Sequence, residues 1–108
     1  MRLPRRVRVL GRWYGIARAE TIQHPDKPGK EADALCVLDR HAILIRSGLR
    51  LEDAREALWH EIKHIIVEVL DINPKTEKGH RIASVIEDSV MADNPSLARL
   101  YGRERPDA

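Results

Sequence analysis

The chain has 108 residues, of which 43% are hydrophobic, with a formal net charge of +2 and one cysteine. This length predicts a single domain with one modest core, and so small a charge gives no argument by itself for nucleic-acid binding. A single cysteine excludes an internal disulfide, and no apolar run approaches the ~18 residues of a membrane span. We therefore expect a cytoplasmic protein with no membrane partner.

The amino-terminal segment predicts a hairpin of two short strands that turns at Gly11. Its apolar residues are Val7, Val9, Trp13, Tyr14 and Ile16. We expect Trp13 to lie in the core or at its edge. Arginines crowd this segment, and a basic strand of this kind is more typical of a solvated edge than of a phosphate-binding arm.

The next segments predict a loop and a second hairpin. Residues 20–32 contain two prolines, a glycine and many charges, which indicates a mobile loop. Residues 35–38 and 42–46 are β-rich runs on either side of Asp39 and Arg40, which predicts a second tight hairpin. Cys36 lies in the first of these runs and is expected to be a small buried side chain.

Residues 51–70 change to a helical pattern with separate apolar and polar faces. At about 100° per residue, counted from His60, the apolar stripe lies between about 140° and 240°. The stripe consists of Leu51, Leu58, Ile62, Ile65, Ile66 and Val69. The polar flank, between about 0° and 100°, consists of His60, Glu61, His64 and Glu68. Lys63 falls near 300°, away from both faces.

Pro74 lies in a break, after which a second helix is expected from Thr76 or Gly79 to residue 92. Asn94 and Pro95 predict the cap and first residue of a short terminal helix that ends at residue 101. Residues 102–108 are expected to be a frayed tail. The predicted fold class is α+β, with a small antiparallel sheet of two hairpins packed on the two longer helices, in one domain of residues 1–101.

Residues 60–64 read HEIKH, the H-E-x-x-H pattern, within the first predicted helix. Residues four apart on a helix project the same way, so the imidazoles of His60 and His64 can hold one cation. Glu61 is then placed to take a proton from water activated by that cation. The pattern predicts a hydrolase with one Zn²⁺ ion, in which Glu61 is the general base.

A catalytic zinc takes three protein ligands, so one ligand is still needed. The second helix is the natural donor, because its short connection returns it alongside the first. It offers Glu77, His80, Glu87 and Asp88. His80 and Glu87 share a face but cannot both bind, because seven residues rise ~10 Å along a helix and ligand bonds are ~2 Å. We predict His80 as the third ligand, with Glu87 as the alternative.

The motif of residues 60–64, preceded by the strand and helix opening of residues 43–49, resembles the small zincin metallopeptidases of bacteria and phages. Over residues 5–101 the layout is most similar to the ImmA/IrrE-like metallo-endopeptidases, whose last helix often ends in a sequence like that of residues 93–95. The resemblance implies a compact zincin-like fold, a zinc-dependent peptidase, a peptide or protein substrate, and the cytoplasm of a bacterium or of a phage-infected host.

In that family the third ligand is usually a glutamate at the head of the second helix, followed by a set pattern of apolar residues. Setting His80 at that place brings four apolar residues into register: Ile82, Ala83, Ile86 and Val90. A histidine that follows a glycine, as His80 follows Gly79, is similar to the SprT-like (Spartan-type) proteases. The stricter zincin motif has uncharged middle residues, and Lys63 departs from it.

Zincins as a class bind substrate as an extended strand along a sheet edge, and residues 42–46 are the expected edge. The loop of residues 20–32 is the candidate cover of the cleft, with His24 expected in solvent. Two alternative functions are kept. One is a zincin fold that binds zinc or a protein partner without catalysis. The other is an SprT-like DNA-associated protease whose phosphate contacts come from Arg5, Arg6 and Arg8.

Overall fold

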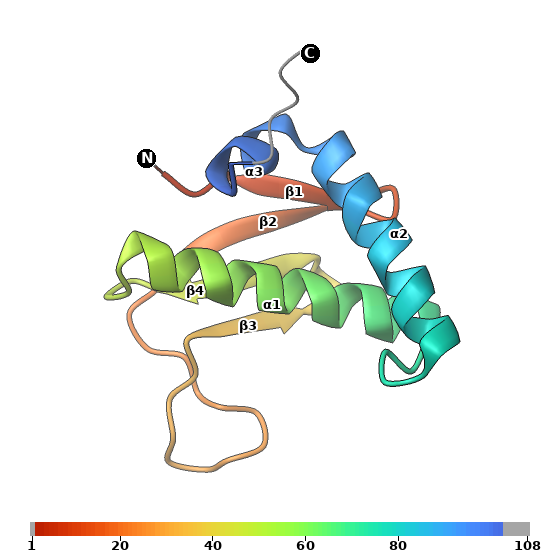
Figure 1. The fold of residues 1–108 in the computed structure, drawn as a ribbon. Helices are drawn as coiled ribbons and strands as arrows, with labels where there is room; N and C mark the ends of the chain where they lie inside the picture. The colour runs from red at the N-terminus through yellow and green to blue at the C-terminus, as the bar shows by residue number, and fades with distance from the viewer. Residues whose placement is uncertain (1, 103–108) are drawn as a thin grey trace.

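A computed structural model describes residues 2–102, which form one four-stranded sheet with three helices on one of its faces (Figure 1). The strands are β1 (Arg6–Val9), β2 (Arg12–Ala19), β3 (Ala34–Val37) and β4 (Ala42–Arg46). The helices are α1 (Leu51–Leu70), α2 (Glu77–Asp93) and α3 (Pro95–Leu100). The α+β class is therefore confirmed. No helix within residues 2–102 is both long and apolar enough to cross a lipid bilayer.

The two predicted hairpins are both present, but the sheet that they form is mixed rather than antiparallel. Its strand order is β1-β2-β4-β3, and β2 pairs with β4 in parallel, from Gly15 opposite Ala42 to Ala19 opposite Arg46. Strand β4 is therefore an inner strand, and the expectation that residues 42–46 form the sheet edge is wrong. The edge next to α1 is β3. Local patterns specify each hairpin, whereas a parallel pairing between strands joined by a long connection leaves no local signal.

The turns of the two hairpins differ in kind. Leu10 and Gly11 both have positive φ, at 52° and 78°, as a two-residue hairpin turn of the I′ type requires. The second connection is a 3-10 turn over Leu38–Arg40 that ends at His41 in the left-handed conformation, with φ 49°. The predicted position of this hairpin is confirmed, and its turn is one helical turn rather than a tight two-residue loop.

The loop of residues 20–32 has more hydrogen-bonded structure than its composition indicates. The amide of His24 donates to the carbonyl of Lys30, and the amide of Ala32 donates to that of Ile22. Ile22 is buried, so one end of the loop is anchored by an apolar side chain. The segment is therefore a small irregular hairpin that is attached to the body of the molecule.

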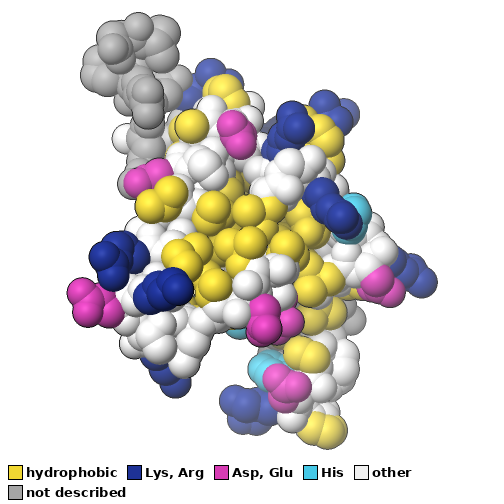
Figure 2. Space-filling view, turned by 90° about the vertical axis from the view of Figure 1, so that its right-hand side faces the viewer, with side chains coloured by type: hydrophobic (Ala, Val, Ile, Leu, Met, Phe, Trp, Pro, Cys, Tyr) yellow, Lys and Arg dark blue, Asp and Glu magenta, His cyan; other side chains and the backbone are white. Residues whose placement is uncertain are grey.

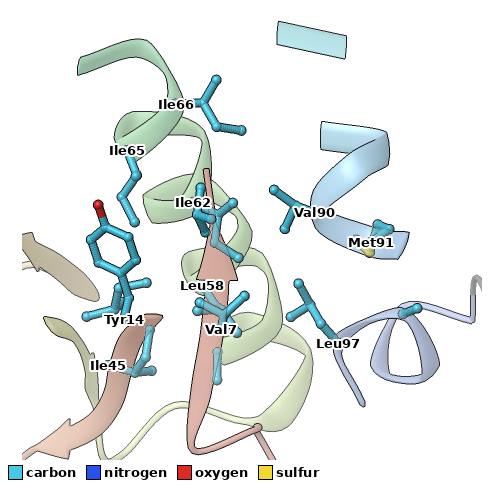
Figure 3. Close-up of a cluster of buried hydrophobic side chains, with 14 residues drawn as sticks. Val7, Tyr14, Ile45, Leu58, Ile62, Ile65, Ile66, Val90, Met91 and Leu97 are labelled. Atoms are coloured by element: carbon cyan, nitrogen blue, oxygen red, sulfur yellow. The ribbon is translucent and has the colours of Figure 1, made fainter. Parts of the chain in front are cut away.

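The core lies between the inner face of the sheet and the helices (Figure 3). Its largest fully buried side chains are Val7, Val9, Tyr14, Ile43, Ile45, Leu58, Ile62, Ile65, Ile66, Val90 and Leu97. The predicted apolar stripe of α1 supplies four of them and is confirmed over its central turns. Val69, in the last turn, is instead 51% exposed.

Trp13 lies outside this core, on the opposite face of the sheet. Successive residues of a strand point to opposite faces, and Tyr14 points inward. The Trp13 side chain is 43% exposed, and the guanidinium of Arg6 lies 3.9 Å from the centroid of its ring. The expectation that Trp13 lies in the core or at its edge is therefore wrong. Two of the amino-terminal arginines, Arg6 and Arg8, lie over this ring.

Exposed apolar side chains also gather over α2 and the end of α1, where charged residues surround them (Figure 2). The large exposed ones in this part of the described chain are Val69, Leu70 and Val85. A shallow groove on α2 is lined by Lys78, Arg81, Ile82, Val85 and Ile86.

The start of α2 is held by a side-chain cap. The Thr76 hydroxyl accepts a hydrogen bond from the amide of Gly79 at 3.0 Å and donates one to the carbonyl of Asn73 at 2.8 Å. A Cβ atom at Gly79 would lie 1.8 Å from that carbonyl oxygen, so only glycine permits this approach. Of the two predicted starts, Thr76 is the one that the structure uses.

The junction of α2 and α3 is tied to the sheet by Asn94, which is buried. Its side-chain oxygen accepts from the amide of Arg8 at 2.7 Å, and its side-chain nitrogen donates to the carbonyls of Arg8 and Val90, both at 2.7 Å. Asn94 does precede α3, as predicted, but its side chain makes no capping hydrogen bond to that helix. Apart from Gly102, the predicted tail lies outside the described residues.

Candidate functional site

Four polar side chains form one row along α1, each a helical turn from the next: Glu56, His60, His64 and Glu68. The row lines a cleft of about 960 Å³ whose opposite wall comes from β3 and from the hairpin of residues 20–32. Residues four apart on a helix are neighbours on its surface, so the two imidazoles lie between the two carboxylates. The local helix geometry alone builds this arrangement.

The imidazoles of His60 and His64 are placed as a pair of metal ligands would be. Their Nε2 atoms are 2.9 Å apart, and the ring planes are nearly perpendicular at 89°. Two Zn–N bonds of ~2.0–2.1 Å at a tetrahedral angle separate the nitrogens by about 3.3 Å. The observed distance is short of this by less than half an ångström, so these two side chains fit a shared zinc ion.

Glu61 lies beside this pair and is almost completely buried, with 9% of the residue exposed. Its carboxylate lines the cleft, and within residues 2–102 it forms no hydrogen bond. Its oxygens are not among the inaccessible unpaired polar atoms of residues 2–102, so the carboxylate is open to a ligand in the cleft. The structure thus brings together His60, His64 and Glu61, three of the four predicted site residues.

Cys36 belongs to this site, although the sequence indicated only a buried apolar run. It is half-buried on β3 and lines the cleft opposite α1. Burial, and then the nearby Glu61 carboxylate, raise the pKa of the Cys36 thiol to about 11. The thiol is therefore neutral at physiological pH and next to the proposed base. Only the pairing of β3 with β4, which directs alternate residues towards α1, brings it there.

Alkylation of Cys36 in the metal-free protein should report this environment. The thiolate is the reactive form, so the rate should rise about tenfold per pH unit until pH approaches the thiol pKa, near 11. The Glu61→Gln variant removes the negative charge that raises this pKa and should react faster at pH 8. Glu68→Gln is the matched control. Mass spectrometry of the adduct measures the rate, and equal rates in the parent and Glu61→Gln would contradict the coupling.

His24 also lines the cleft. The sequence had placed this residue in solvent. Its Nδ1 accepts a hydrogen bond from the amide of Asp26 at 3.1 Å. A neutral imidazole that accepts at Nδ1 carries its proton on Nε2, which then donates and cannot bind a cation. In this arrangement the Nδ1 atom of His24 is already occupied by a backbone donor.

The fourth predicted residue, His80, is not brought to the other three. It is exposed in the first turn of α2 and is not among the residues that line the cleft. Among residues 2–102, no three histidine, cysteine, aspartate or glutamate side chains gather closely enough to hold one ion. The side chains as they stand therefore supply two ligands, and the third ligand stays a prediction.

Glu87, the alternative ligand, extends from α2 to the side of α1 that carries Lys63 rather than to the side that carries the two histidines. Its Oε1 atom lies 3.8 Å from Nζ of Lys63. Lys63 was expected near 300°, away from both the apolar stripe and the polar flank, and this ion pair agrees with that position. The charged residue that departs from the zincin motif therefore faces α2 instead of the cleft.

Comparisons of the chain with protein-family models, with curated proteins and with solved structures found no match. The site is therefore interpreted from its own geometry.

Proposed function

We propose that this protein is a zinc-dependent metallopeptidase of the zincin type that cleaves peptide or protein substrates. The observation that carries the proposal is the pair of Nε2 atoms of His60 and His64, 2.9 Å apart at a large cleft, with the buried carboxylate of Glu61 beside them. A polar pair on the flank of a helix whose other side is core is the arrangement that H-E-x-x-H peptidases use.

A zinc ion at this place supplies a Lewis acid that polarises water and the substrate carbonyl. Glu61 takes the proton from the attacking water and passes it to the amine that leaves. Its place on the cleft wall beside the two imidazoles suits this role, because a general base must lie within reach of the water that it deprotonates. The neutral thiol of Cys36 adds no competing charge beside it.

We propose His80 as the third ligand, with Glu87 as the alternative. Within residues 2–102, neither Glu56 nor Glu68 of the same row joins the two histidines in a group that could hold one ion. His24 lines the cleft, but its Nδ1 already accepts a hydrogen bond from the amide of Asp26. The proposal of a ligand from α2 rests on the sequence, and it requires His80 to move to the cleft or Glu87 to leave Lys63.

Metal analysis of purified variants tests this proposal. The parent should bind one zinc ion per chain, and His60→Ala and His64→Ala should each lose it. His80→Ala should weaken binding by more than the 10–100-fold typical of residues that only orient a ligand. His41→Asn, which changes a histidine outside the cleft and tolerates its left-handed backbone, should bind as the parent does. Stoichiometric zinc in His60→Ala would overturn the proposal.

If His80→Ala binds zinc like the parent and Glu87→Gln does not, the alternative ligand is correct. If His80→Ala and Glu87→Gln both bind zinc like the parent, neither His80 nor Glu87 is a ligand.

A further inference from the structure

The cleft is acidic, although the chain as a whole carries slightly more basic than acidic residues, 19 against 17. Its six acidic lining residues are Asp26, Asp33, Asp53, Glu56, Glu61 and Glu68. The only lysine or arginine among the lining residues is Arg46. Such an excess of one sign in a concave site focuses its field and attracts ligands of the opposite charge.

Two of these carboxylates already have cationic partners. Asp33 pairs with Arg46 at 2.9 Å, and Asp53 pairs with Arg50 at 3.4 Å. Within the described chain no ion pair is formed by Asp26, Glu56 or Glu68. The buried carboxylate of Glu61 lies among them without a hydrogen bond. The cleft therefore retains negative charge that the protein itself does not neutralise.

Glu56 and Glu68 are placed on either side of the histidine pair, each one helical turn beyond it. Twelve residues separate them, a rise of ~18 Å along α1. An extended peptide covers ~3.3 Å per residue, so this distance corresponds to about five residues. A peptide lying along α1 with its central bond at the histidines would bring residues before and after that bond within reach of one carboxylate each.

We propose that the cleft selects peptides with lysine or arginine on both sides of the cleaved bond, and that Glu56 and Glu68 are the residues that determine this specificity. The inference rests on the proposed peptidase function for the position of the bond. The apolar lining of the cleft, Ala34, Leu35, Leu38, Leu49 and Ala57, suits the methylene stems of these side chains.

Binding of fluorescent decapeptides to zinc-loaded Glu61→Gln tests the inference without cleavage. One peptide carries two lysines five residues apart, and matched peptides carry glutamine or glutamate at the same positions. The lysine peptide should bind about tenfold more tightly than the glutamine peptide at low salt, because it forms two additional exposed ion pairs. The difference should shrink as salt is added.

Substitution of both carboxylates, Glu56→Gln with Glu68→Gln, should remove most of this preference. The matched control is Glu52→Gln with Glu77→Gln, which removes the same charge from exposed positions outside the cleft. This control should keep the preference for the lysine peptide. Equal binding of the three peptides, or an equal loss in the control, would overturn the inference.

The outcome is separable from that of the proposed function. Peptide hydrolysis by the parent with no preference for lysine would overturn the specificity and leave the peptidase in place. Selective binding of the lysine peptide that depends on Glu56 and Glu68, in a protein that cleaves nothing, would support the acidic recognition and contradict the peptidase.

Discussion

The Glu61→Gln variant is expected to bind zinc as the parent does and to lose peptide hydrolysis by about 10²–10⁴-fold, the usual contribution of a general base. Glutamine has nearly the same shape as glutamate but cannot accept a proton from water. Because Glu61 is 9% exposed and forms no hydrogen bond within residues 2–102, the substitution breaks no packing contact or hydrogen bond that supports the fold. The fold should be at least as stable.

Zinc content, the unfolding midpoint and the rate of cleavage of an unfolded protein substrate should be measured on the same preparations. Glu52→Gln is the control, because it removes a carboxylate from the same helix at an exposed position outside the cleft. It should keep most of its activity. Activity of Glu61→Gln equal to the parent's would exclude Glu61 as the base.

The same experiment separates the alternative functions. A zincin fold without catalysis predicts stoichiometric zinc and no cleavage in either the parent or the variant. A DNA-associated protease predicts salt-dependent DNA binding that weakens when Arg5, Arg6 and Arg8 are neutralised. Because Arg6 lies 3.9 Å from the Trp13 ring, its substitution should be compared with that of Arg5 alone.

The Asn94→Ala variant is expected to lower the free energy of unfolding by about 2–4 kcal/mol. Three hydrogen bonds of 2.7 Å are lost, and the amide and carbonyl of Arg8 lose this partner, with a cost of ~1–3 kcal/mol for each group left unsatisfied when buried. For a domain of this size this is a large part of the total stability of ~5–15 kcal/mol.

Urea unfolding followed by circular dichroism measures the loss. Asn73→Ala is the control, because the exposed Asn73 side chain accepts one hydrogen bond, from the amide of Lys75. It should change the stability by less than about 1 kcal/mol. A loss in Asn94→Ala no larger than that of the control would show that Asn94 does not hold α2 to β1.

Helix α1 is the part of the fold that the sequence predicts best. The alternation of apolar and polar residues at the helical period predicts which side of α1 is buried, and the spacing of His60 and His64 predicts their pairing. Both are consequences of the 3.6-residue turn, so they do not depend on the rest of the fold. The two hairpins and the start of α2 at Thr76 follow equally from local turn and capping chemistry.

The residues and strands around α1 are set by contacts between segments that are distant in the sequence. The parallel pairing of β2 with β4 makes β3 the edge strand, and the pairing of β3 with β4 brings Cys36 to the side of Glu61. The attachment of the loop of residues 20–32 brings His24 to the cleft wall, and the packing of α2 pairs Glu87 with Lys63. No periodicity within one segment encodes these contacts.

The sequence by itself determined the helices, the hairpins and the pairing of His60 with His64 on α1, because each depends on residues within a few positions of one another. The tertiary structure alone decided which strand borders the cleft, which side chains line it and how much of its charge is left unpaired. Those properties depend on how separate elements pack, and packing is selected by the buried area of the whole chain rather than by any one segment.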